Sequence, residues 1–177
     1  MGITPTFKKE DIEKRFRAFL DVVEKRTLDR LQRLGEECMK VARNNGDYTD
    51  QTGNLRSSVG YMIFNNGVAV HDHFKQVVQK NEATGKNKKI GLEGVNVGRK
   101  AALEIGSKYK RGYALVVVAG MNYAVAVESG RRKKPDGTYY TATPRDVLTS
   151  AEIYAKQMLP VMLEQLKNNI SKATKSI

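Results

Sequence analysis

The strongest constraint on the fold is a long run of helical periodicity near the start of the chain. From about residue 10 to residue 44, apolar side chains recur at steps of three and four, which is the spacing of one face of an α-helix. Such a helix would be roughly 50 Å long, more than the diameter of a domain of 177 residues. We therefore expect part of it to project from the body or to pack on a neighbouring molecule. The apolar residues of this face are Ile12, Phe16, Phe19, Leu20, Val23, Leu31, Leu34, Cys38 and Val41.

The middle of the chain predicts a small, mainly antiparallel β-sheet with a helix inserted into it, over about residues 52–128. A β-hairpin is indicated where residues 59–64, rich in β-formers, are followed by Asn65-Asn66-Gly67 and by residues 68–70. Two more strands are expected over residues 113–119 and 123–128. The inserted helix is expected over residues 93–109, with Val97, Ala101, Ala102, Ile105 and Tyr109 on its apolar face.

The last element predicted is a helix over about residues 143–172. Thr143 is a good N-cap, Pro144 suits the first helical position, and Asp146 complements the positive end of the helix dipole. Pro160 is expected to kink or split this helix. The order of elements predicts an α+β fold in a single domain, residues 1–177, without internal repeats. The expected apolar face consists of Val147, Ala151, Tyr154, Met158, Met162 and Leu166.

The net charge of +12 is concentrated in two segments of the chain. Residues 75–111 hold ten Lys and Arg against three Glu, and residues 131–136 hold four against one Asp. Solvated loops explain this pattern, and so does contact with a polyanion, of which nucleic acid is the obvious example. The basic surface that we single out consists of Lys86, Lys88, Lys89, Arg131, Arg132, Lys133 and Lys134.

Several candidate reaction centres are weak, and we expect neither an enzyme nor a cofactor. His71-Asp72-His73 offers two imidazoles on one side of a strand, without a third metal ligand. The glycine-rich residues 91–98 lack the Lys-Ser/Thr ending of a phosphate loop and are typical of a hinge before a helix. The acidic residues Glu128, Asp136 and Asp146 have the spacing of no nuclease motif.

Two further features narrow the class of protein. Cys38 is the only cysteine, so an internal disulfide is excluded, and its place in a helical pattern indicates a small buried residue rather than a reactive thiol. The sequence has no apolar run of about 20 residues that would span a bilayer. We therefore expect no membrane partner.

The stretch TGNLRSSV, residues 52–59, begins as a turn and leads into a strand. Gly53 permits a backbone angle closed to other residues, Leu55 can fill the core, and Arg56 offers five hydrogen-bond donors at the head of the strand. A simple interpretation is a turn with one surface arginine.

Together with NYAVAVESG, residues 122–130, and TPRDVLTSA, residues 143–151, this stretch resembles the tail-completion or head–tail joining family of tailed bacteriophages and prophages. The three stretches occur in order and extend the resemblance over roughly residues 10–170. The residues that carry it are Thr52, Gly53, Leu55, Arg56 and Ser58; Tyr123, Ala124, Val127, Glu128 and Gly130; and Pro144, Arg145 and Leu148.

The resemblance implies a small virion structural protein without enzymatic activity. Copies would assemble as a homo-oligomeric ring in the tail or neck, with other neck or tail proteins as partners, after assembly in the host cytoplasm. The basic segments would then face packaged DNA or an acidic neighbour. The alternative is a free-standing, charge-driven nucleic-acid-binding protein, although its basic segments are poor in interleaved aromatic residues.

Overall fold

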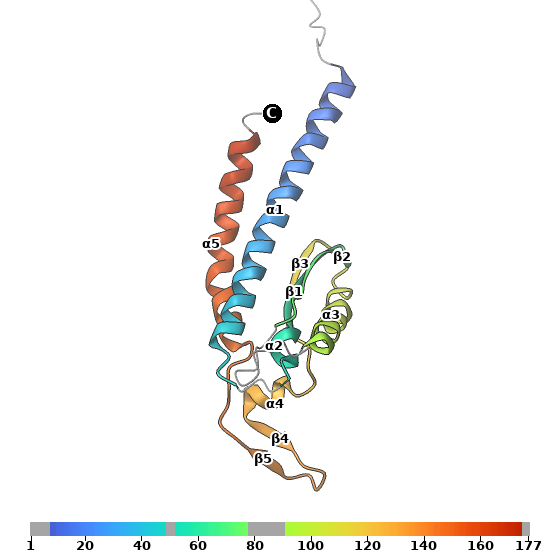
Figure 1. Cartoon of the computed structure of the whole chain (residues 1–177). Helices are drawn as coiled ribbons and strands as arrows, with labels where there is room; N and C mark the ends of the chain where they lie inside the picture. Colours follow the sequence, from blue (N-terminus) through green and yellow to red (C-terminus); the bar gives the residue numbers. More distant parts are fainter. Residues whose placement is uncertain (1–7, 49–51, 78–90, 175–177) are drawn as a thin grey trace, which may run out of the picture.

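The computed structural model describes residues 8–48, 52–77 and 91–174, and Figure 1 shows their arrangement. The elements found in these residues are α1 (Lys9–Asn45), α2 (Asn54–Ser58), β1 (Val59–Asn65), β2 (Val68–His73), α3 (Leu92–Gly106), β3 (Tyr113–Ala119), α4 (Ala124–Ser129), β4 (Arg131–Lys133), β5 (Tyr139–Thr141) and α5 (Thr149–Thr174). Helices and strands are both present and the sheets are antiparallel, so the predicted α+β class is confirmed.

A three-stranded antiparallel sheet in the order β2-β1-β3 lies at the centre of the fold. The predicted hairpin is confirmed, because Asn66 and Gly67, at its turn, both have positive φ, as a tight two-residue turn requires. Strand β2 continues beyond the predicted residues 68–70 to His73, so residues 71–73 belong to the sheet. The strand predicted over residues 113–119 is β3.

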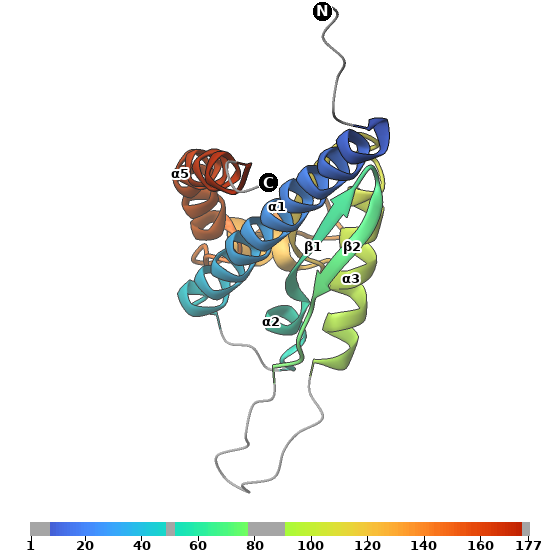
Figure 2. The ribbon, with the colours of Figure 1, turned by 90° about the horizontal axis from the view of Figure 1, so that it is seen from above.

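Helices cover both faces of this sheet, with α1 and α3 on opposite sides of β1 and β2 (Figure 2). Successive side chains of a strand point to opposite faces, so Tyr61 and Ile63 join the core with α1, while Met62 and Phe64 join the core with α3. Burial on both faces explains why β1 is apolar almost throughout, without the alternation of a half-exposed strand.

The predicted long helix is confirmed as α1, and its two halves have different surroundings. Leu34, Cys38 and Ala42 are buried between the sheet and α5, which runs antiparallel to α1 (Figure 1). The first turns of α1 extend beyond the end of α5 (Figure 1). All residues from 8 to 18 are exposed, and the Phe16 side chain is 60% exposed. Part of the helix therefore projects, as its length predicted.

The inserted helix is confirmed as α3, but its predicted apolar face is wrong. Ile105 and Tyr109 are exposed, and of the five predicted residues only Ala102 is buried. The contact face instead consists of Gly94, Val95, Gly98, Ala102 and Gly106. A Cβ atom at Gly94 would collide with the Asn54 carbonyl, and one at Gly106 with the Phe64 ring. The contact face consists of small residues because the α3 backbone lies very close to its neighbours. A search for large apolar residues therefore does not find this face. The predicted hinge over residues 91–98 is thus largely the start of α3.

Two predictions for residues 123–142 are wrong. Residues 124–129 form helix α4 rather than a strand, because a helix places Ala124 and Val127 together against Leu55 and Val147. The expected loop after it contains the two-stranded β4–β5 hairpin.

The final helix, α5, begins at Thr149 rather than Thr143, because Glu128 accepts hydrogen bonds from the backbone at its start. It runs through Pro160 as one element, so the proline does not split it. Ala151, Met158 and Met162 pack against the core, as predicted, and join α5 to the sheet and to α1.

Candidate functional site

The three stretches that carry the family resemblance meet at one place, where α1 ends and α5 begins. Leu55 from the first stretch, Ala124 from the second and Val147 from the third are buried in one cluster, together with Tyr48. We call this region, residues 46–48, 52–58, 121–130 and 142–149, the motif junction. Stretches far apart in sequence therefore form one structural unit.

The first stretch enters the junction through the predicted tight turn. Gly53 has a φ of 70°, in the left-handed region that favours glycine, and Thr52 Oγ1 accepts a hydrogen bond from Asn54 N–H at 3.4 Å. The turn starts helix α2, in which the Leu55 side chain is only 2% exposed. Ser58 Oγ donates to the Leu55 carbonyl at 2.7 Å and accepts from Met121 N–H at 3.4 Å. The predicted turn and buried leucine are confirmed.

Arg56 lies in α2, not at the head of a strand as predicted, and its guanidinium is turned toward the end of α1. It donates to the carbonyls of Arg43 and Gly46, the latter at 2.9 Å, and lies 5.0 Å from the centre of the Tyr48 ring. The last carbonyls of a helix lack partners within the helix and carry partial negative charge. Arg56 therefore stabilises the C-terminal end of α1.

Glu128 has the corresponding role at the start of α5. Its Oε1 atom accepts hydrogen bonds from Leu148 N–H at 3.1 Å, from Thr149 N–H at 2.7 Å and from Thr149 Oγ1 at 2.6 Å. Burial raises the pKa of this carboxyl, but these hydrogen bonds outweigh burial and hold the pKa below its usual value. A side chain 21 residues away in sequence thus caps this helix.

Gly130 and Arg145 join the second stretch to the third. Gly130 has a φ of 64° at the end of α4, and a Cβ atom there would collide with the Ala142 carbonyl. Arg145 N–H donates to the Val127 carbonyl at 3.0 Å, and its guanidinium forms an ion pair with Asp47 at 2.6 Å. Pro144, beside Gly130, lies before α5 rather than at its first turn.

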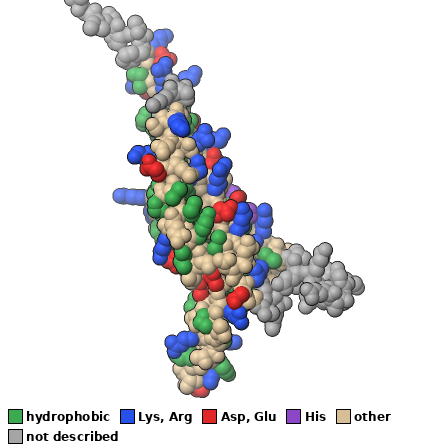
Figure 3. Space-filling view, turned by 90° about the vertical axis from the view of Figure 1, so that its left-hand side faces the viewer, with side chains coloured by type: hydrophobic (Ala, Val, Ile, Leu, Met, Phe, Trp, Pro, Cys, Tyr) green, Lys and Arg blue, Asp and Glu red, His purple; other side chains and the backbone are tan. Residues whose placement is uncertain are grey.

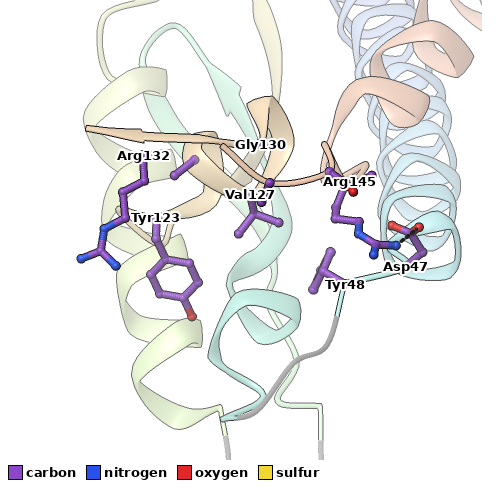
Figure 4. Close-up of a pocket in the computed structure, with 10 residues that line it drawn as sticks. Asp47, Tyr48, Tyr123, Val127, Gly130, Arg132 and Arg145 are labelled. Atoms are coloured by element: carbon purple, nitrogen blue, oxygen red, sulfur yellow. Dashed lines mark hydrogen bonds and ion pairs between the residues drawn. The ribbon is translucent and has the colours of Figure 1, made fainter. Parts of the chain in front are cut away.

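An open cleft of about 600 Å³ lies on the surface of the junction (Figure 4). Arg132 and Tyr123 lie on one side of it in this view, and Arg145, paired with Asp47, lies on the other. The guanidinium, hydroxyl and methyl groups that line the cleft suit a partner that offers carboxylate or carbonyl oxygens beside apolar groups. The cleft is lined by Asp47, Tyr48, Tyr123, Ala126, Val127, Gly130, Arg132, Ala142, Thr143 and Arg145.

The predicted basic surface is only partly within the described residues. Arg131, Arg132 and Lys133 form strand β4 and Lys134 follows it, whereas Lys86, Lys88 and Lys89 lie outside the described residues. The four described cations stand together on the hairpin that extends from the motif junction.

The weak candidate reaction centres have structural partners. His71 and His73 flank the buried Tyr61 ring, with centroid distances of 5.7 and 5.5 Å. Asp72 on the opposite face pairs with Arg99 at 2.6 Å. Within residues 8–48, 52–77 and 91–174, no three His, Cys, Asp or Glu side chains are grouped as metal ligands.

The three carboxylates considered for a nuclease are engaged separately. Glu128 caps α5, Asp136 accepts from Thr138 within a turn, and Asp146 accepts from Ser150 N–H at 3.1 Å. Cys38 is buried as predicted, and burial raises the pKa of its thiol to about 11.

Sequence reasoning missed two residues of the junction, Asp47 and Tyr48. They follow the end of α1 and belong to none of the three stretches. Asp47 belongs to the site through its ion pair with Arg145, and Tyr48 through its contact with Arg56 and its burial beside Leu55. The only sequence signal for them was a charged and an aromatic residue shortly after a helix. That pattern is too common to indicate a site.

None of the helices in the described part of the chain has the length and apolar character that a membrane span requires. No protein-family model matches the sequence, and no curated protein or solved structure shows significant similarity to it.

Proposed function

We propose that this protein is a non-enzymatic structural component of a tailed bacteriophage or prophage virion. Copies form a homo-oligomeric ring that joins the tail to the head, in contact with other neck or tail proteins. The observation that carries the proposal is the meeting of the three family-like stretches at the motif junction. Short motifs that matched by chance would have no reason to share one core and one set of helix caps.

The contacts within the junction support a role in assembly rather than in a reaction. Arg56 holds the end of α1 and Glu128 holds the start of α5. The junction thereby fixes where the paired long helices leave the sheet. A ring requires this geometry to be the same in every copy, because a small angular error between subunits prevents closure.

The projecting half of α1 supports the oligomeric part of the proposal. Ile12, Phe16 and Leu20 follow one another at steps of four residues along one face of the helix, and all three are exposed. Contiguous exposed apolar side chains commonly mark protein–protein contacts. A neighbouring subunit in the ring would cover them.

The test is electron microscopy of particles produced by a phage genome that encodes Arg56→Ala or Arg145→Ala. We expect filled heads and free tails that do not join, because the neighbouring subunits no longer meet in the correct orientation. Immunogold labelling of wild-type particles should place the protein at the neck or tail.

A matched control is Arg99→Ala, which removes an exposed arginine paired with Asp72 outside the junction and should leave particles intact. Thermal melting of each purified variant separates misassembly from unfolding. Normal virions from a genome that lacks the gene, or absence of the label from neck and tail, would contradict the proposal.

A further inference from the structure

The β4–β5 hairpin, residues 131–141, carries positive charge on both of its faces. Arg131 pairs with Thr141, Arg132 with Tyr140 and Lys133 with Tyr139. Because side chains alternate along a strand, Arg131, Lys133 and Tyr139 share one face. The opposite face has the same composition, with Arg132, Lys134 and Tyr140. We call this hairpin the basic ribbon.

The basic ribbon projects from the body of the molecule. It extends beyond α4, away from α1 and α5 (Figure 1), and forms a separate lobe with Lys and Arg side chains in the space-filling view (Figure 3). Tyr139 is 48% exposed and Tyr140 is 60% exposed. Both faces are therefore accessible to a partner.

A tyrosine ring supports one cation on each face. The Arg131 guanidinium lies 4.6 Å from the centre of the Tyr139 ring, and Lys134 Nζ lies 4.5 Å from the centre of the Tyr140 ring. Such contacts orient a cation without neutralising its charge. The tyrosines thus hold the positive groups in place while leaving them able to bind an anion.

The carboxylate of the ribbon, Asp136, accepts hydrogen bonds within the turn and forms no ion pair with the ribbon's cations. Asp136 accepts hydrogen bonds from Thr138 N–H at 2.8 Å and from Thr138 Oγ1 at 2.6 Å, and these bonds lower its pKa. In the described part of the chain, no ion pair involves Arg131, Arg132, Lys133 or Lys134. No carboxylate of the described residues therefore neutralises these four cations by a direct ion pair.

The base of the ribbon is tied to the motif junction. Ala142 N–H donates to the Gly130 carbonyl at 2.7 Å, and Lys134 N–H donates to the Thr138 carbonyl at 2.7 Å near the tip. The cations are thus carried by a short ordered element with two opposed faces.

We propose that the basic ribbon binds duplex DNA by entering the major groove, with each face directed to one phosphate backbone. The major groove of B-form DNA is about 12 Å wide and admits a two-stranded β-ribbon between its two rows of phosphates. A flat acidic protein surface would contact one face and leave the other cations unused. This proposal concerns DNA binding by the isolated protein. It therefore does not depend on whether the protein is part of a virion.

The test is a salt titration of the purified full chain with fluorescent duplex DNA, followed by fluorescence anisotropy. Each phosphate contact contributes about −0.9 to the slope of log affinity against log salt. Arg131→Ala/Lys133→Ala and Arg132→Ala/Lys134→Ala, one pair from each face, should each make the slope shallower by about 1.8. The quadruple variant should make it shallower by about 3.6.

The control variant is Lys25→Ala/Arg26→Ala, which removes two exposed cations from α1 and should leave the slope unchanged. Duplex RNA of the same sequence should bind more weakly through the ribbon, because its major groove is deep and narrow.

Three results would overturn the proposal. An effect of only one face would indicate docking on a flat surface, and an equal effect of the α1 control would indicate diffuse charge. Ribbon-dependent binding to polyglutamate that is tighter than binding to DNA would assign the ribbon to an acidic protein partner instead.

Discussion

The motif junction and the basic ribbon are adjacent in the chain, yet they are built in opposite ways. The junction buries Leu55, Ala124 and Val147 and joins two helix ends through Arg56 and Glu128. The ribbon consists of two strands of three exposed residues each. A substitution in the junction therefore acts on folding and assembly together, whereas a substitution in the ribbon can change binding without changing the fold.

The largest effect is expected from Leu55→Ala. This side chain is almost completely buried, so its removal leaves a cavity and should lower the free energy of unfolding by about 2–5 kcal/mol. Urea denaturation measures the change. Leu103→Ala, at an exposed leucine of α3, is the matched control and should cost far less. Equal effects of the two variants would show that the junction is not part of the cooperative core.

Gly53→Val should have the next largest effect. The left-handed backbone at this position strains any β-branched residue, at a cost of about 1–3 kcal/mol. Gly53→Asn should restore much of the lost stability, because asparagine tolerates this conformation. Thermal melting of both variants tests the backbone explanation. If the asparagine variant is as unstable as the valine variant, the explanation is wrong.

Glu128→Ala should destabilise the protein by about 0.5–2 kcal/mol, the usual effect of losing a helix N-cap. Chemical denaturation measures the loss. Glu152→Ala, which removes an exposed glutamate within α5, is the control and should have little effect.

The Glu128 interaction should also depend on pH. Because the folded protein lowers this pKa below the ordinary value of 4.5, the charged carboxylate contributes stability above that pH, and the contribution is lost as pH falls through the folded-state pKa. The stability difference between the wild type and Glu128→Gln should therefore shrink at low pH. A constant difference between about pH 3 and pH 6 would argue against the cap.

The smallest effect on stability is expected from the ribbon. Replacing Arg131, Arg132, Lys133 and Lys134 with alanine should change the free energy of unfolding by no more than about 0.5 kcal/mol, as is usual for exposed residues. Calorimetry of the purified variant measures this. A large loss of stability would remove the contrast between the ribbon and the junction.

Elements with a long or unambiguous local signal were predicted well. The helix α1, 37 residues long, repeats its apolar spacing from Ile12 to Val41, and the β1–β2 turn follows from Asn66-Gly67. Short segments were not predicted well. The apolar residues 123–128 were predicted to be a strand. Packing of Ala124 and Val127 against the other stretches instead favours helix α4, because tertiary contacts readily override the local preference of six residues.

Part of the motif junction was singled out from the sequence, but its geometry was not. The sequence singled out Arg56, Glu128 and Arg145 through a resemblance, without indicating that two of them bind helix ends. Asp47 and Tyr48 carried no recognisable pattern. Asp47 pairs with Arg145, which is distant in sequence. Tyr48 contacts Arg56, which follows a separate turn.

The sequence by itself determined the α+β class, the long projecting helix, the central hairpin and the concentration of positive charge. These properties follow from periodicity, turn chemistry and composition, which act over a few neighbouring residues. Only the tertiary structure decided the face of α3, the start of α5 and the two-sided basic ribbon. Each depends on groups distant in sequence: the Phe64 ring and Asn54 carbonyl that require glycine, the Glu128 carboxylate that caps Thr149, and the strand pairing that divides four consecutive cations between two faces.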